Sequence, residues 1–188
     1  VLALQEYDFS NQNGSNAKQL VIKEIDRFYK AIEFDDIDEI EKNEYKQYLK
    51  KNIKSKYGNS ALEYAIRQNS RKIINYLLHS IDFNKENENI YGENALMMAA
   101  FMGNYELVQT LINVSKVNVN RDGWSPIHYA VIKGNLDIVK ILLREGVNVD
   151  ALTPDETTPL MLAIRYGHIH VVKLLLDKGA DLSAVNKQ

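Results

Sequence analysis

Histidine is the residue type of this chain best suited to reactive chemistry, because imidazole exchanges protons near neutral pH and ligates metals. The chain has four histidines, and His168 and His170 form an H-x-H pair that could hold a metal ion. On or beside a helix, however, such a pair diverges by about 200°, and no third ligand is evident. His79 stands alone near the end of an expected helix. We therefore predict no metal site and no bound cofactor.

Covalent catalysis finds equally little support in the sequence. There is neither a nucleophile elbow nor a glycine-rich phosphate loop. A Ser–His–Asp arrangement is not decided by the sequence alone. The helical repeats described below use nearly every residue, which leaves no separate catalytic domain. We expect a protein that is not an enzyme and has no catalytic residues.

Composition narrows the remaining classes of function. The 188 residues carry 23 basic and 25 acidic side chains, so no broad positive field is available to hold nucleic acid. No apolar stretch approaches the roughly 18 residues that cross a bilayer, and no signal peptide is evident. Cysteine is absent, which fits a chain that needs no oxidising compartment. We expect a cytoplasmic protein that neither binds nucleic acid nor inserts into a membrane.

A four-fold internal repeat supplies the elements that position these side chains. In each copy, a turn residue is followed two positions on by a short polar residue, then by an apolar residue and an alanine. The turn residues are Gly58, Gly92, Gly123 and Glu156, which gives steps of 34, 31 and 33 residues. A second apolar run follows each alanine by eight to thirteen residues. This regularity predicts one structural unit per copy.

Each copy predicts a pair of short helices. The short polar side chains that can cap the first helix are Ser60, Asn94, Ser125 and Thr158. Pro126 and Pro159 then stand at the first helical position, where a missing N–H costs nothing. Gly103, Gly134 and Gly167 supply left-handed turns between the helices. The second helix carries an amphipathic stripe, so neighbouring copies must stack to bury it.

The pattern resembles the ankyrin repeat family, whose motif reads D-x-x-G-x-T-P-L-H-x-A-A-x-x-G-H. The third copy matches best, from Asp122 to Ala130, and the fourth nearly as well. The resemblance covers residues 56–184 and implies an all-α ankyrin-repeat solenoid of stacked helix–turn–helix units with hairpin or turn loops. Its four repeats would span about 56–88, 89–120, 121–153 and 154–186.

Several positions depart from the family motif. Alanine replaces proline at 61 and 95, and the motif histidine is replaced by Glu63, Met97 and Met161. Asn69–Ser70 replaces the Gly–His pair of the first repeat, and Glu156 replaces the turn glycine of the fourth. These changes should weaken individual turns without changing the fold. At His128, which keeps the motif, the resemblance implies structural hydrogen bonds near the turn.

Residues 19–55 precede the recognisable repeats and carry two apolar stripes separated by Asp35–Asp36. Because Ala31 lies 34 residues before Ala65, we interpret this region as a divergent N-terminal helical capping repeat. An independent helical hairpin docked on the stack is the alternative. We expect residues 1–18 to be a flexible tail. The chain lacks an initial Met and stops where a further repeat would begin, so we expect a fragment of a longer protein.

Partner binding is the function that the resemblance implies, with turn tips and first helices lining a concave surface. The candidate contact residues are Tyr57, Arg67, Tyr91, Glu93, Phe101, Met102, Asp122, Trp124, Ile132, Lys133, Asp155, Arg165 and Tyr166. Aromatic residues and arginine are typical of binding hot spots. Ile132 and Met102 could instead pack between neighbouring repeats. For Trp124 and Tyr91, near the turn tips, we favour exposed contact residues.

The sequence therefore predicts a non-catalytic protein–protein interaction module, monomeric, with another protein as its partner. The alternative is a regulatory or targeting ankyrin domain of a larger enzyme, membrane protein or host-directed effector. A host-directed role would place the protein in a host cell. The acidic run from Glu33 to Glu44 is either a solvated face or a docking patch for a basic partner.

Overall fold

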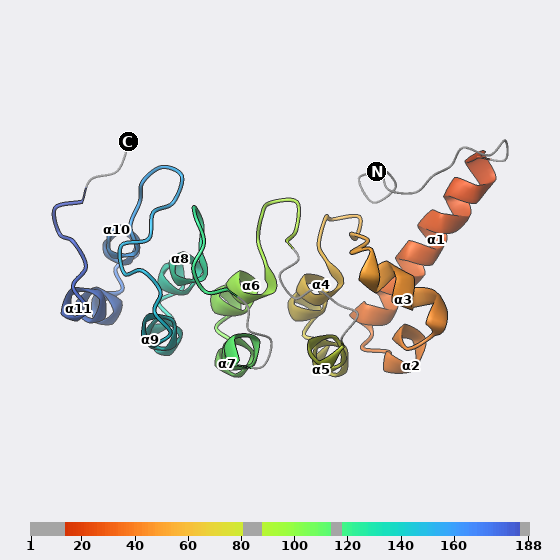
Figure 1. Cartoon of the computed structure of the whole chain (residues 1–188), viewed down its shortest axis with the longest axis horizontal. Coiled ribbons are helices and arrows are strands. Elements are labelled where there is room, and N and C mark those ends of the chain that lie inside the picture. The colour runs from red at the N-terminus through yellow and green to blue at the C-terminus, as the bar shows by residue number, and fades with distance from the viewer. Residues whose placement is uncertain (1–13, 81–87, 114–117, 185–188) are drawn as a thin grey trace. The chain divides into compact units, whose positions relative to one another are not determined.

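The computed structural model describes residues 14–80, 88–113 and 118–184. Within these ranges every named element is a helix, and one isolated antiparallel bridge pairs Glu88 with Asn94. The helices are α1 (Gly14–Glu33), α2 (Ile37–Ile40), α3 (Asn43–Lys50), α4 (Ala61–Gln68), α5 (Arg71–His79), α6 (Ala95–Met102), α7 (Tyr105–Asn113), α8 (Pro126–Ile132), α9 (Leu136–Arg144), α10 (Pro159–Arg165) and α11 (Ile169–Asp177) (Figure 1). The all-helical prediction is confirmed.

The chain forms two compact units, Val1–Ala95 and Leu96–Gln188, which are described separately. In the first unit, α4 packs on α5, α1 packs on α4, and α2 packs on α5. In the second unit, α8 pairs with α9 and α10 with α11. These two pairs stack through contacts of α8 with α10 and of α9 with α11. Helices of equivalent position therefore stack on each other, as the repeat predicts.

The turn between paired helices has one geometry in all four repeats. Its left-handed residues are Asn69 (φ 58°), Gly103 (φ 73°), Gly134 (φ 66°) and Gly167 (φ 73°). After each of them, the next backbone N–H donates to the carbonyl of the repeat alanine, as from Ser70 to Ala65 at 3.0 Å. This bond satisfies a carbonyl that the helix end leaves unpaired. Asparagine tolerates the left-handed region, which explains how the first repeat manages without glycine.

Helix starts follow the predicted capping chemistry. The Ser60 hydroxyl oxygen accepts a bond from the Glu63 backbone N–H, and the Glu63 carboxylate accepts one from the Ser60 backbone N–H at 2.8 Å. This reciprocal capping box satisfies two donors at the start of α4. Thr158 caps α10 by accepting from the backbone N–H of Met161 at 3.2 Å. Each first helix therefore begins at the residue that the sequence indicates.

The core of each unit is a row of aliphatic side chains at equivalent repeat positions. Leu77 on α5, Leu142 on α9 and Leu175 on α11 are completely buried. The repeat alanines Ala65 and Ala130 are also completely buried, because only a small side chain fits between helices this close. The predicted burial of Leu142 and Leu175 is confirmed.

The region before the first repeat shares the turn geometry of the repeats. Asp35 is left-handed (φ 54°), and the Asp36 N–H donates to the Ala31 carbonyl at 2.9 Å, which matches Ser70 and Ala65 one repeat later. With α1 against α4 and α2 against α5, these contacts fit a capping repeat. Its description as a cap or as a separate hairpin stays a prediction.

Helix α1 begins earlier than expected. Residues 14–18, which we predicted as part of a flexible tail, form the first turn of α1, and residues 1–13 lie outside the described residues. The apolar stripe of α1 is buried from Ile25 to Ile32, whereas Leu20 and Ile22 are exposed. The stripe alone does not show where burial starts, because burial depends on tertiary packing as well as on helical spacing.

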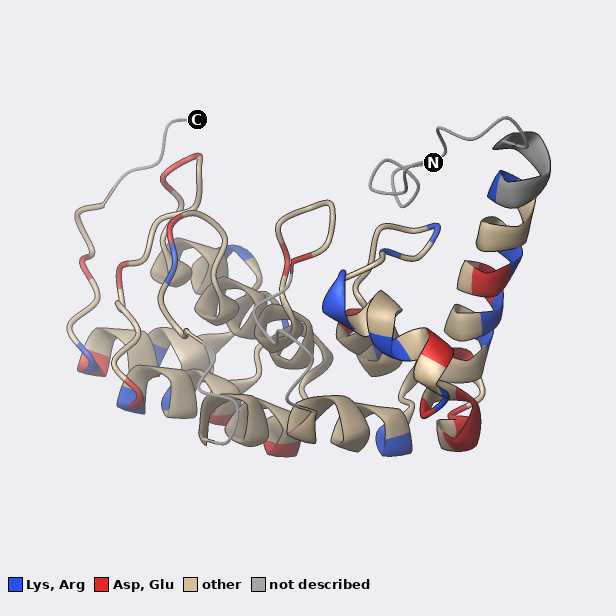
Figure 2. Ribbon diagram, turned by 45° about the vertical axis from the view of Figure 1, so that its right-hand side comes forward, with Lys and Arg blue, Asp and Glu red and all other residues tan. Residues whose placement is uncertain are grey.

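Three residues of the acidic run after Glu33, namely Asp35, Asp36 and Glu39, make structural contacts. The Asp35 carboxylate accepts the backbone N–H groups of Lys72 and Ile73 and so caps α5, while Asp36 caps α2. Glu39 pairs with Lys42 and lies 2.9 Å from Arg27 Nε. Figure 2 shows acidic and basic residues interleaved along α1 and α3, and acidic residues on α2. The interpretation as a solvated structural face accounts for these contacts.

Candidate protein-binding surface

In three of the four repeats, the turn that precedes the first helix is built by one short polar side chain. In the first, second and fourth repeats, the backbone N–H of this residue donates to the carbonyl four residues on. Its side-chain oxygen accepts a hydrogen bond from the N–H of that same later residue. The three turns span Ser55–Asn59, Asn89–Glu93 and Thr153–Thr157. Each loop closes on itself and holds its tip residues outward.

The fourth position of this turn requires a left-handed residue. Gly58, Gly92 and Gly123 have φ of 77°, 73° and 73°, and Glu156 has φ of 60°. At Gly58 a Cβ atom would also come within 2.6 Å of the Ile90 side chain. Glu156 therefore replaces the turn glycine without changing the loop, at the cost of backbone strain.

In the first unit, the tip residues Tyr57 and Tyr91 are 58% and 75% exposed. Lys56 Nζ lies 5.0 Å from the centre of the Tyr57 ring, a cation–π distance. In the same turn as Tyr91, the Glu93 carboxylate lies 3.6 Å from Arg67 Nη2 and accepts a hydrogen bond from the Asn89 side-chain amide at 2.7 Å. The sequence named Arg67 and Glu93 as separate contacts, whereas the structure pairs them.

In the second unit, three aromatic rings and a lysine form a continuous row. The Trp124 and Tyr129 ring centres are 5.8 Å apart, and those of Tyr129 and Phe101 are 6.1 Å apart, both edge to face. Lys133 Nζ lies 4.2 Å from the centre of the Phe101 ring. We call these four residues, Phe101, Trp124, Tyr129 and Lys133, the aromatic row. Aromatic rings next to a cation are typical of protein-binding hot spots.

Trp124 is exposed at its turn, although only in part, and Tyr129 lies beside it. Trp124 is only 38% exposed, because its ring packs edge-on against His128, at 5.7 Å between ring centres, and against Tyr129. The neighbouring helix α8 thus covers much of a side chain that we expected to stand free at the turn tip. Tyr129 was not among the candidates, although the variable position between the motif histidine and alanine is a place to look for contacts.

The side chains of the remaining candidates in the second unit differ in their exposure to solvent. Tyr166 is 51% exposed and stacks on His168, with ring centres 6.3 Å apart, and Met102 is 49% exposed. Ile132 is half-buried, in line with the packing alternative. Asp122 and Arg165 are exposed. Met102 is thus more open to a partner than Ile132.

Asp155 is exposed, but its carboxylate is already engaged. It accepts hydrogen bonds from the hydroxyls of Thr153 at 2.5 Å and Thr157 at 2.9 Å. These two bonds hold the pKa of Asp155 below its ordinary value. The structure therefore explains Asp155 as part of the turn, and contact with a partner is not needed to account for it.

His128 is a completely buried structural side chain. Its Nδ1 atom accepts the Ser125 backbone N–H at 3.1 Å, so Nε2 carries the proton and donates to the Ala151 carbonyl at 3.0 Å. Burial lowers the pKa of His128 below 6.5. This geometry matches the structural role that the family resemblance implies.

His168 also has a structural role. Its Nε2 atom lies 3.0 Å from the Ile132 carbonyl oxygen, and so it ties the fourth repeat to the third. Among residues 14–80, 88–113 and 118–184, no group of three side chains of metal-binding type comes together. The described helices are also too short or too polar to cross a membrane.

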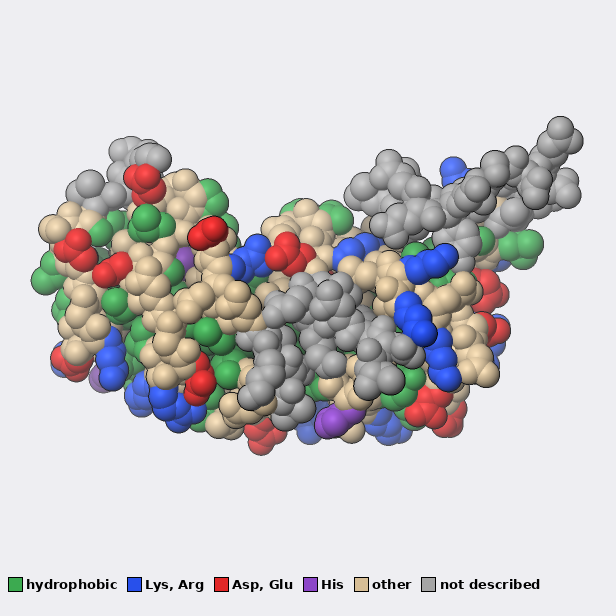
Figure 3. Space-filling view, in the orientation of Figure 1, with side chains coloured by type: hydrophobic (Ala, Val, Ile, Leu, Met, Phe, Trp, Pro, Cys, Tyr) green, Lys and Arg blue, Asp and Glu red, His purple; other side chains and the backbone are tan. Residues whose placement is uncertain are grey.

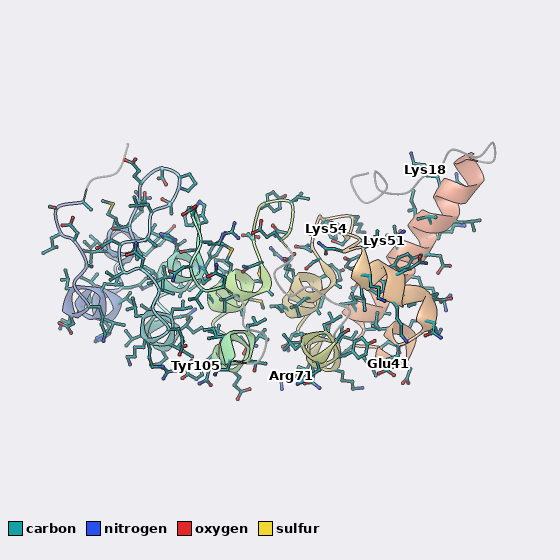
Figure 4. The ribbon with its side chains drawn as sticks, viewed as in Figure 1. Lys18, Glu41, Lys51, Lys54, Arg71 and Tyr105 are labelled. Atoms are coloured by element: carbon teal, nitrogen blue, oxygen red, sulfur yellow. The ribbon has the colours of Figure 1, made fainter. Side chains whose placement is uncertain are left out.

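Glu63 occupies the position of His128 in the first repeat and is also completely buried. One carboxylate oxygen serves the capping box, and the other has no hydrogen-bond partner. Burial raises the pKa of Glu63 from 4.5 to about 7, further raised by Glu93 and opposed by Lys54, which is labelled in Figure 4. Glu63 therefore changes charge near neutral pH.

The stacked helix pairs, left-handed turns and capped first helices define a helical-repeat solenoid. A family model described as ankyrin repeats (3 copies) matches residues 80–153 and 96–186, which together cover more than half of the chain. The chain belongs to the ankyrin repeat family. The predicted family is thereby confirmed.

Similar proteins come from diverse organisms. Notch-regulated ankyrin repeat-containing protein B of Danio rerio is 34% identical over 84 residues, which cover 42% of this chain and 76% of that protein. Putative ankyrin repeat protein FPV223 of fowlpox virus is 34% identical over 84 residues, 44% of this chain and 57% of that protein. Alpha-latrocrustotoxin-Lt1a of Latrodectus tredecimguttatus is 33% identical over 91 residues, 46% of this chain. The match spans only 6% of that toxin.

Proposed function

We propose that this chain is a non-catalytic module that binds another protein through the exposed side chains of its repeats. Ankyrin repeats are a general protein-interaction module, and the family assignment supports this class of function. The observation that carries the proposal is the aromatic row of the second unit. It places rings and a lysine on the first helices and turn of two successive repeats.

The partner that fits this row presents apolar groups together with an acidic group. The rings offer apolar area, and the Lys133 ammonium offers one cation beside them. A monomeric module in the cytoplasm would suit such a role, and both properties stay predictions. The alternative, a regulatory or targeting domain of a larger enzyme, membrane protein or effector, uses the same surface and also stays a proposal.

The test compares the proteins captured by the wild-type chain with those captured by two variants. Phe101→Ala removes a ring of the row, and Tyr105→Ala removes a ring of nearly equal exposure on α7 (39% against 36%). Figure 4 labels Tyr105 at the start of α7. A true partner should be lost with Phe101→Ala and kept with Tyr105→Ala in quantitative mass spectrometry.

The captured partner is then purified and its dissociation constant measured with both variants and with Lys133→Ala. Hot-spot truncation typically costs about 2 kcal/mol or more, so Phe101→Ala should weaken binding roughly 30-fold. Equal loss with Tyr105→Ala, or no loss with any row variant, would show that binding lies elsewhere.

A further inference from the structure

The first unit contains a small pocket whose walls include three tyrosines. It is formed by α1, by α4 and by the turn that precedes α4, and its volume is about 250 Å³. Sites that hold a whole small molecule commonly measure about 300–1,000 Å³, so this pocket has room for one side chain rather than for a cofactor. We call it the tyrosine pocket. The lining residues that decide its chemistry are Asp26, Tyr29, Glu33, Lys56, Tyr57 and Tyr64.

Hydrogen bonds and a ring contact fix the inner wall of the tyrosine pocket. The Tyr29 hydroxyl lies 2.7 Å from the Ile53 carbonyl oxygen and 3.0 Å from that of Asn59. The Tyr29 and Tyr64 rings meet edge to face with their centres 5.1 Å apart, and both side chains are buried. Because two carbonyl oxygens already share the hydroxyl proton of Tyr29, that proton is not available to an anionic ligand.

Tyr57 forms the outer wall of the pocket, and a cation of the chain itself already rests on it. The Ser55 hydroxyl oxygen accepts the Tyr57 backbone N–H at 3.3 Å, which fixes the backbone under a ring that is 58% exposed. Lys56 Nζ lies 5.0 Å from the centre of this ring. A hydrogen bond with the Tyr57 side chain, and more weakly the Asp26 carboxylate, raises the pKa of Lys56 above its ordinary value. The pocket therefore favours a positive charge at this ring.

Two carboxylates of α1, those of Asp26 and Glu33, border the pocket and are exposed. Burial, and after it the charge of Glu33 and a hydrogen bond to its carboxylate, raise the pKa of Tyr64. This contact places the Glu33 carboxylate beside the rings. Lys30 also lines the pocket and stands one helical turn from each carboxylate. Two ammonium groups thus balance two carboxylates, and the negative faces of the tyrosine rings decide in favour of a cation.

Long-range attraction does not select the ligand, because the first unit also carries many basic side chains. Figure 3 shows Lys and Arg side chains gathered over α3, where Lys46 and Lys50 are exposed. The ligand must therefore be selected by short-range contacts with the rings and carboxylates of the pocket. A guanidinium group meets both, because it is planar, stacks on aromatic rings and pairs with a carboxylate through two parallel N–H donors.

We propose that the tyrosine pocket binds an arginine side chain of a partner protein, with the guanidinium against the Tyr57 ring and its N–H groups toward Glu33. The ligand takes the place of the Lys56 ammonium, which is exposed and sits on a flexible stem. A lysine of the partner fits less well, because a single ammonium has no planar fork for a ring and a carboxylate together. An anionic ligand would meet both carboxylates and the negative ring faces.

The test titrates the whole chain with three blocked tripeptides that differ only in the central residue. That residue is arginine, lysine or citrulline, and citrulline keeps the shape of arginine without its charge. Amide chemical shifts of the nitrogen-15-labelled protein report binding at Lys56 and Tyr57. The arginine peptide should shift these amides. The citrulline peptide should bind at least about tenfold more weakly, because it loses the charge-assisted pair, and the lysine peptide should fall between the two.

Two substitutions should change arginine binding in opposite directions. Glu33→Gln removes the carboxylate at the pocket and should weaken binding about tenfold. Lys56→Gln removes the cation that occupies the Tyr57 ring and should strengthen binding about threefold or more. Glu41→Gln is the matched control, because it removes an exposed carboxylate of the same unit that does not line the pocket and is labelled in Figure 4. It should change the affinity by less than about twofold. Thermal unfolding checks that each variant keeps its fold.

Four outcomes would overturn the proposal. Equal affinity for the arginine and citrulline peptides would show that charge is not recognised. Equal weakening by Glu33→Gln and Glu41→Gln would reduce the effect to general attraction between charges. Weaker binding after Lys56→Gln would point to an anionic ligand, such as the peptide's terminal groups in an unblocked form. The absence of any shift at Lys56 and Tyr57 at about 10 mM arginine peptide would mean that the pocket does not bind arginine.

This inference does not rest on the proposed binding surface, because the tyrosine pocket shares no residue with the aromatic row. Phe101→Ala tests the row through partner capture, and Glu33→Gln tests the pocket through peptide titration. Either result can fail while the other holds.

Discussion

The first and third repeats place different ionisable residues at one buried position, and the two carry opposite pH dependence. Glu63 and His128 each stand three residues after the capping serine, and each accepts the backbone N–H of that serine. Burial favours the neutral form of both, so it raises the pKa of Glu63 to about 7 and lowers that of His128. An acidic or a basic side chain can thus hold the same backbone geometry. The two side chains differ in the pH range over which the fold keeps its full stability.

The neutral forms complete their bonding differently. His128 uses both ring nitrogens, one toward Ser125 and one toward the Ala151 carbonyl of the following loop. Glu63 bonds only within its own repeat, and one oxygen is left without a partner. Histidine therefore links two repeats, whereas glutamate only caps one helix. This position therefore contributes more to stacking between repeats in the second unit than in the first.

The largest predicted effect comes from the core, and it tests whether the first and third repeats are packed equivalently. Leu77 and Leu142 occupy the same position, and both are completely buried. Leu77→Ala and Leu142→Ala should each cost about 2–5 kcal/mol, because each leaves a cavity. Urea unfolding followed by circular dichroism measures the loss. Leu182→Ala, at a residue 74% exposed, is the control and should stay within about 0.5 kcal/mol. A melting temperature of Leu142→Ala within a degree of wild type would show that the repeat register is wrong.

The second prediction concerns Glu63. The folded protein holds a proton on Glu63 that the unfolded chain releases above pH 4.5, so stability of the first unit should fall as pH rises from about 4.5 through 7. A shift from 4.5 to about 7 corresponds to a loss on the order of 3 kcal/mol. Glu63→Gln should flatten this dependence and slow amide exchange of α4 and α5 at pH 8. Glu106→Gln on α7, an exposed residue, should change neither.

The third prediction concerns His128. The unfolded chain binds a proton below pH 6.5 that the folded second unit excludes, so stability of the second unit should fall as pH is lowered. His128→Ala should cost about 1–3 kcal/mol at pH 8, because it leaves the Ser125 N–H and the Ala151 carbonyl without their partner. The same substitution should also remove the loss of stability that acidification causes in the wild-type second unit. Urea unfolding at pH 8 and pH 5 gives both quantities. Unchanged acid sensitivity in the variant would assign that sensitivity to another group.

Much of the fold could be predicted because repeated spacing constrains many residues at once. The 34-residue offset of Ala31 from Ala65 even located the turn at Asp35, which has the same hydrogen bonds as that at Asn69. The start of α1 at Gly14 could not be read in the same way. No repeat motif marks it, and its apolar stripe continues into the exposed residues Leu20 and Ile22.

The candidate surface was less predictable than the fold. The sequence located Trp124 at a turn tip, but it could not show that α8 lies close enough to cover much of the ring. Nor could it show that Tyr129 joins Trp124 to Phe101, because that contact crosses from one repeat to the next. Exposure at such positions is set by side-chain packing between repeats, and spacing along the chain does not determine it.

The smallest predicted effects distinguish Trp124, in the turn of the third repeat, from Tyr91, in the turn of the second. Trp124 makes two edge-to-face ring contacts, each worth about 0.5–1.5 kcal/mol. Tyr91, in contrast, is 75% exposed at its tip. Trp124→Ala should therefore destabilise the second unit by about 1–3 kcal/mol, and Tyr91→Ala should change stability by less than about 0.5 kcal/mol. Urea unfolding of the two single variants by circular dichroism is the measurement, since Trp124→Ala removes the chain's one tryptophan. Trp124→Phe, which keeps a ring at the site, should recover part of the loss. Equal stability of Trp124→Ala and wild type would mean that the ring contributes nothing to packing and is held in place only to meet a partner.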